Sequence, residues 1–136
     1  MIYLDASALV KFVKRETESA ALREWRLGLA QGTVLLTSEL ARLEIARALY
    51  RAGADPTRVP YHVGQALRGI HLVVITQPVL ARAAAYTTPR LGSLDAIHLA
   101  SAEPLQPELD QFVSYDDELN AVASGVGLPT TVPRDS

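Results

Sequence analysis

The chain has 136 residues, no cysteine and a formal net charge of −2, with a pI near 5.9. The absence of cysteine excludes a disulfide scaffold, thiol catalysis and a cysteine-ligated zinc site, and the charge argues against a passive basic nucleic-acid binder. Hydrophobic residues make up 49% of the chain, and no apolar run approaches the roughly 20 residues of a membrane span. We therefore expect one domain over residues 1–136 with no membrane segment, located in the cytoplasm.

Strand and helix signals alternate along the sequence. A short buried strand is expected at 1–6, followed by a helical stretch from Ser7 and an amphipathic helix at about 18–30. The remaining expected elements are a strand at 34–36, helices at 38–52 and 55–68, a strand at 71–75, helices at 78–86 and 93–103, a strand at 111–114, a helix at 116–123 and a fifth strand at 130–132. This order predicts an α/β sandwich whose mostly parallel central sheet of four to five strands is flanked by helices.

Four carboxylates occupy strand ends or helices beside them, each in an apolar sequence context. Asp5 and Asp116 each follow a strand, whereas Glu44 and Asp95 lie on helices. Ligands of parallel sheets bind beyond the carboxyl ends of the strands, so these acids are expected to converge there. Converging carboxylates would repel one another and take up protons, and no lysine or histidine is placed to neutralise all four. A divalent cation, which prefers oxygen ligands, is the natural partner.

Each of the first two acids also has an ordinary structural interpretation. Asp5 could cap the helix that begins beside it, and Ser7 could orient either the carboxylate or a metal-bound water. Glu44 could form a surface ion pair with Arg47, three residues further along its helix.

The other two acids have similar alternatives. Asp95 lies in the first helical turn, where the helix dipole favours a carboxylate, and His98 near it is more often a core or rim residue than a ligand. Asp116 and Asp117 are adjacent, so one is expected to cap the helix while the other reaches the site; Ser114 could supply a hydroxyl.

The motifs around these acids resemble a known family over essentially the whole chain. They are Asp5-Ala6-Ser7-Ala8-Leu9-Val10-Lys11, Ser38-Glu39-Leu40 leading into Glu44, Leu94-Asp95-Ala96-Ile97-His98-Leu99-Ala100 and Val113-Ser114-Tyr115-Asp116. In this order they resemble the PIN-domain ribonucleases, and most closely the VapC-type toxins of bacterial toxin–antitoxin pairs. The resemblance implies a three-layer PIN-like sandwich, a homodimer and a cognate antitoxin. A homodimer is also expected from the helix pair at about 38–68, where Val59, Tyr61 and Leu67 would expose more apolar surface than a lone small domain should show.

The same resemblance implies a site and an activity. Asp5, Glu44, Asp95 and Asp116 would bind one or two Mg²⁺ or Mn²⁺ ions and hydrolyse RNA phosphodiesters, with Ser7, Ser114 and Asp117 in support. Apart from the resemblance, Arg42, Arg47 and Arg51 share the helix of Glu44 and are candidate RNA-binding residues; the alternative is that they form an ordinary solvated helix face. Such an endoribonuclease toxin would inhibit translation and growth.

Other classes of protein fit the sequence less well. A receiver-type phosphorylation module needs a lysine at its last strand end, and no lysine follows Lys14. A dehalogenase-type phosphatase needs an aspartate where Ser7 stands. A stand-alone PIN nuclease in RNA processing and a catalytically inactive PIN binding module remain the alternatives.

Overall fold

A parallel sheet organises the fold. The computed structural model describes residues 1–135, in which five strands pair in the order β3-β2-β1-β4-β5, and every pairing is parallel. The strands are β1 (Ile2–Leu4), β2 (Leu35–Ser38), β3 (Ile70–Val73), β4 (Gln111–Val113) and β5 (Thr130–Thr131). The helices are α1 (Ala6–Leu9), α2 (Ser19–Leu27), α3 (Leu40–Arg51), α4 (Val59–Ala66), α5 (Gln77–Ala85), α6 (Ser93–Ala102) and α7 (Asp117–Gly125), with 3₁₀ turns η1 (Val10–Phe12) and η2 (Glu103–Glu108). The predicted α/β sandwich is confirmed.

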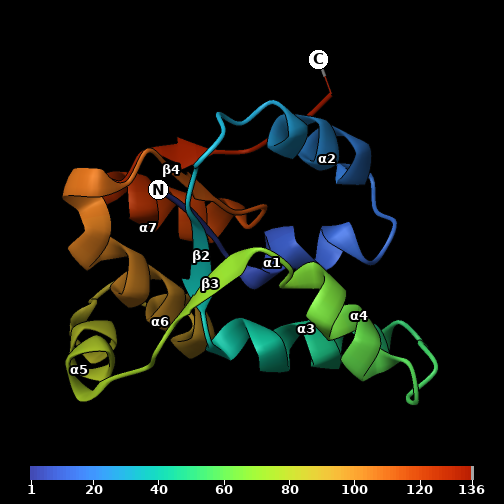
Figure 1. Ribbon diagram of the computed structural model, residues 1–136. Helices are drawn as coiled ribbons and strands as arrows, with labels where there is room; N and C mark the ends of the chain where they lie inside the picture. Colours follow the sequence, from blue (N-terminus) through green and yellow to red (C-terminus); the bar gives the residue numbers. More distant parts are fainter. Residues whose placement is uncertain (136) are drawn as a thin grey trace.

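Helices cover both faces of the sheet and make three layers (Figure 1). Because successive strand residues point to opposite faces, Ile2 and Leu4 pack with α1 to α4, whereas Tyr3 packs with α6 and α7. The first core includes Leu22, Ile45, Leu49 and Val63; the second includes Leu36, Leu99, Phe112 and Leu119. The central strand β1 is thus buried on both faces, as a continuous apolar run predicts.

Local signals explain where α3 and α4 begin and end. Gly53 adopts a φ of 82°, a conformation that favours glycine, and it follows the last residues of α3 as predicted. The expectation that the next helix starts at Asp55 is wrong. The Asp55 carboxylate accepts hydrogen bonds from the Thr57 amide and hydroxyl, which stabilises a turn, and α4 begins only at Val59.

No helix within residues 1–135 combines the length and hydropathy needed to cross a bilayer.

Candidate active site at the carboxyl edge of the sheet

Asp5 is a buried carboxylate held by three donors. It follows β1, is 3% exposed and caps α1 by accepting from the Ala8 amide at 3.1 Å. The Ser7 hydroxyl donates to Oδ1 at 2.6 Å, and the Ser114 hydroxyl donates to Oδ2 at 2.7 Å. Burial raises the pKa of Asp5 above its ordinary value, while these hydrogen bonds favour the ionised form and oppose the rise. The capping and the functional interpretations are therefore compatible.

The two serines also tie together the ends of β1 and β4, which are adjacent strands. Ser7 Oγ accepts from the Tyr115 amide at 2.9 Å, and Ser114 Oγ accepts from the Asp116 amide at 3.0 Å. Each hydroxyl thus donates to Asp5 and accepts from the β4–α7 connection. These hydrogen bonds fix the position of Asp5 relative to the backbone that carries Asp116.

The negative charges of the other three acids contribute to the raised pKa of Asp95. It lies in the first turn of α6 and is partly buried. Burial, followed by the charges of Asp116, Asp5 and Glu44, raises the pKa of Asp95 to about 6. The charges of all three act on this one carboxyl, so the four predicted acids lie within electrostatic reach of one another.

Glu44 contacts α6 rather than an arginine of its own helix. Its carboxylate is hydrogen-bonded to Nε2 of His98, which is 1% exposed, and the other ring nitrogen contacts the Tyr3 hydroxyl at 2.7 Å. The alternative of a Glu44–Arg47 surface pair is thus replaced by a contact between α3 and α6. His98 is a satisfied core residue, as expected.

The side chains of Asp116 and Asp117 have different environments and different partners. Asp116 Oδ1 caps α7 by accepting from the amides of Glu118 and Leu119 at 2.9 and 3.1 Å. Its charge also acts on Asp95, so one residue combines the two roles that were expected to be divided. The side chain of Asp117 is 91% exposed and lies 3.8 Å from Arg134.

The oxygen atoms of the four acids suit a divalent cation, although they are not arranged as a complete coordination site. The four acids offer oxygen ligands only, and within residues 1–135 no lysine or arginine forms an ion pair with any of them. Burial and the neighbouring carboxylates raise the pKa of Asp95, which a bound cation would oppose. In the same part of the chain, no three His, Asp or Glu side chains already stand in an arrangement that could hold a metal ion. The residues therefore fit a hard cation chemically, and binding one would require the carboxylates to adjust.

The candidate RNA-binding arginines divide between two sides of α3. All three are exposed. Arg47 and Arg51 follow Glu44 by three and seven residues and so share its side of the helix. Arg42 instead lines a groove with Tyr50 and Pro60, between α3 and α4.

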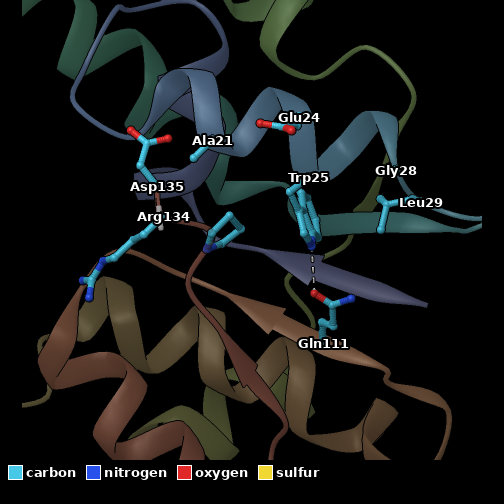
Figure 2. A pocket seen from close by; sticks show the side chains of 9 residues that line it. Ala21, Glu24, Trp25, Gly28, Leu29, Gln111, Arg134 and Asp135 are labelled. Carbon is cyan, nitrogen blue, oxygen red and sulfur yellow. Dashed lines mark hydrogen bonds between the residues drawn. The ribbon is translucent and has the colours of Figure 1, made fainter.

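A broad groove of about 630 Å³ lies away from these acids, between α2 and the C-terminal segment (Figure 2). Trp25 donates from its indole nitrogen to Gln111 at 3.0 Å across its floor, and Arg134 and Asp135 border it. Gln111 begins β4, whereas the candidate site lies beyond the end of that strand. The groove is thus distinct from the carboxylate cluster.

Comparison with known proteins agrees with the geometry. The family model described as the PIN domain matches residues 2–125. This chain belongs to the PIN-domain family. Ribonuclease VapC47 of Mycobacterium tuberculosis strain CDC 1551 / Oshkosh is 38% identical over 136 residues, covering 98% of this chain and 97% of that protein. Ribonuclease VapC46 of strain ATCC 25618 / H37Rv is 36% identical over 132 residues, covering 97% of each. The predicted resemblance to VapC-type ribonucleases is confirmed.

Solved structures share the PIN fold at lower identity. VapC20 of M. tuberculosis, described as a sarcin–ricin loop cleaving toxin, aligns with a TM-score of 0.74 and 13% identity, over 94% of this chain and 96% of that one. A toxin–antitoxin complex from Klebsiella pneumoniae aligns with a TM-score of 0.65 and 17% identity, over the full length of both chains. These similarities extend the agreement in fold.

Two residues beside the candidate site were not predicted from the sequence. The sequence around Tyr3 indicates an ordinary core aromatic residue, yet the Tyr3 hydroxyl contacts both His98 and the Ser38 amide. Asn120 reads as a helix surface residue, yet its side-chain amide donates to the Ser114 carbonyl at 2.9 Å. The signal for Asn120 was its place one turn after Asp116, on the side of α7 nearest the site.

Proposed function

We propose that this protein is a single PIN domain acting as an Mg²⁺- or Mn²⁺-dependent endoribonuclease, the toxin of a toxin–antitoxin pair. The observation that carries the proposal is the group of four carboxylates at this edge of the sheet, in which Asp5 is held by the Ser7 and Ser114 hydroxyls and none of the four pairs with a lysine or arginine of residues 1–135. A structural ion pair would contain a cation, whereas this cluster gathers like charges at the edge where parallel sheets bind ligands. The relatives named as VapC ribonucleases support the assignment of RNA as substrate.

Each acid has a defined part in this proposal. Asp5, Glu44, Asp95 and Asp116 would hold the cation, which supplies charge neutralisation at the phosphodiester and lowers the pKa of a water nucleophile. Ser7 and Ser114 fix the orientation of Asp5, because both its oxygens accept from their hydroxyls. Arg47 and Arg51 lie on the Glu44 side of α3 and would bind flanking RNA phosphates. We expect in-line attack to leave a 5′-phosphate and a 3′-hydroxyl.

The partner and assembly are part of the same proposal. The VapC names and the toxin–antitoxin complex among the structural neighbours support a cognate antitoxin, and the action on translation implies a cytoplasmic location. A homodimer was expected from Val59, Tyr61 and Leu67. Val59 and Leu67 are buried at 1% and 8% exposure, so that part of the argument is wrong. Tyr61 is 60% exposed and, with Leu43 on α3 at 58%, still supports a dimer.

Cleavage of RNA by matched variants tests the function. Asp95→Asn removes one charge from the cluster, and Glu108→Gln removes one from an exposed side chain outside it. We expect the wild-type protein and the Glu108→Gln variant to cleave total RNA with Mg²⁺, and the Asp95→Asn variant to lose cleavage while remaining folded. Near-normal cleavage by Asp95→Asn would remove this residue from the proposed site. Induced expression of the wild-type protein in a bacterium should arrest growth, whereas expression of Asp95→Asn should not. Continued growth with both proteins would refute the toxin role.

A further inference from the structure

A buried hydrogen-bond chain leads from β2 through the central strand β1 to the candidate site. It starts at the Ser38 amide at the end of β2, which donates to the Tyr3 hydroxyl at 3.0 Å. Tyr3, 0% exposed on β1, contacts His98 Nδ1 at 2.7 Å, and His98 Nε2 contacts Glu44 on α3. Four elements are therefore connected through one imidazole ring.

The direction of each hydrogen bond follows from the first. The Ser38 amide can only donate, so the Tyr3 oxygen accepts there and retains its own phenolic proton. We assign that proton to the hydrogen bond with His98 Nδ1, which lies 2.7 Å from the Tyr3 oxygen. A ring whose Nδ1 accepts carries its proton on Nε2, so Nε2–H donates to the Glu44 carboxylate.

The Tyr3 ring has little freedom to release His98. It stacks on Phe112 with ring centroids 5.5 Å apart and an interplanar angle of 4°, and meets the His98 ring edge-on at 5.8 Å and 77°. Rotation of the imidazole would leave the Tyr3 proton and the Glu44 carboxylate without these partners, which is costly in a buried position. The imidazole is thus fixed on both nitrogens.

We propose that His98 is a positioning residue, held by Tyr3 from behind, that presents Nε2–H to Glu44 and fixes this carboxylate in the orientation that receives the cation. The inference rests on the proposed function, in which Glu44 is a ligand. Hydrogen bonds to ligating carboxylates orient them and tune their affinity. A purely structural histidine would stabilise the fold without acting through Glu44.

Mn²⁺ binding without RNA distinguishes the two roles. We expect His98→Leu to weaken Mn²⁺ binding about 10- to 100-fold. His98→Gln, whose side-chain amide can still donate to Glu44, should restore most of the affinity. The control is His71→Gln, because His71 is exposed on β3 and should leave binding unchanged. Melting temperatures of all variants establish that each is folded.

A double-variant cycle shows whether His98 acts through Glu44. In the Glu44→Gln background, His98→Leu should cause no further loss of Mn²⁺ affinity. An equal loss with and without Glu44→Gln would overturn the proposal, because the histidine would then act independently of this carboxylate.

Nitrogen NMR of the His98 ring tests the orientation independently of metal and RNA. The metal-free wild type should show a protonated Nε2 and an unprotonated Nδ1, and Tyr3→Phe should abolish this preference while retaining the aromatic packing. The opposite tautomer, or a ring protonated on both nitrogens at neutral pH, would overturn the proposal. If the tautomer is as expected but the wild type binds no Mn²⁺, the metal-dependent function fails instead, and with it the purpose assigned to His98.

Discussion

Asp95→Asn should stabilise the metal-free protein at neutral pH, although most core substitutions do the opposite. The pKa of Asp95 is raised to about 6 in the folded protein, by burial first and then by neighbouring carboxylates. In the unfolded chain it returns to the ordinary value, so the native state binds the proton more tightly. Stability is then highest below the unfolded pKa and is lost as the pH rises through 4 to 6. Asparagine cannot ionise and avoids this loss.

The size of the effect follows from the shift and from the exposure of the group. A rise from 3.8 to about 6 corresponds to about 3 kcal/mol if fully expressed. Asp95 is only half-buried, so solvent screening reduces this to about 1.5 kcal/mol. The favourable interaction of a first-turn carboxylate with the helix dipole, about 0.5 kcal/mol, is lost as well. The net gain is about 1 kcal/mol, or roughly 3–5 °C in Tm for a chain of this size.

Thermal unfolding in the presence of a chelator measures this gain. Asp95→Asn should melt above wild type at pH 7, with the difference disappearing or reversing near pH 4. Asp117→Asn is a matched control because Asp117 also lies in a first helical turn but is 91% exposed. At pH 7 it should lose the dipole contribution and the weak, exposed ion pair with Arg134. A pH 7 destabilisation of Asp95→Asn larger than that of the control would refute the idea of like-charge repulsion at this site.

Three further outcomes test other parts of the structure. Ser114→Ala should lower the unfolding free energy by about 1–3 kcal/mol in chemical denaturation, because it removes a donor from buried Asp5 and the acceptor of the Asp116 amide; no change would mean that these contacts do not hold the strand ends. Lys11→Met should destabilise the protein by about 2 kcal/mol, since buried Lys11 pairs with both Glu16 and Glu18 at 3.1 Å, and an unchanged Tm would show that the pair contributes nothing. Light scattering at micromolar concentration should give twice the 14.7 kDa chain mass, and a monomeric mass would contradict the dimer.

The layers of the fold could be predicted because hydrophobic periodicity and helix boundaries are local. The apolar strand ending at Asp5 and the glycine after α3 both appear in the structure as expected. The start of α4 could not be predicted from Asp55-Pro56, because an aspartate followed by proline suits a turn as well as a helix N-terminus. Val59 and Leu67 are buried because of how α4 packs on the rest of the fold. Local sequence patterns do not indicate that packing.

The acids of the candidate site could be proposed from the sequence on similar grounds. Position relative to strand ends indicated Asp5 and Asp116, and helix faces indicated Glu44 and Asp95. The contact between Glu44 and His98 joins residues 54 apart in the chain, so a nearby arginine was an equally reasonable partner from spacing alone. The hydroxyl of Tyr3 acquires its role only when β1, β2 and α6 meet, and nothing in the sequence around it indicates that.

Metal titration of RNA cleavage by one preparation tests the central claim most directly. The purified protein, freed of metal with EDTA, should leave a labelled RNA intact, and addition of Mg²⁺ or Mn²⁺ should restore cleavage with 5′-phosphate and 3′-hydroxyl ends. The Asp5→Asn variant should remain folded and inactive at every metal concentration. Full cleavage in EDTA, or cleavage by folded Asp5→Asn at the wild-type rate, would contradict a metal-dependent site built from these carboxylates.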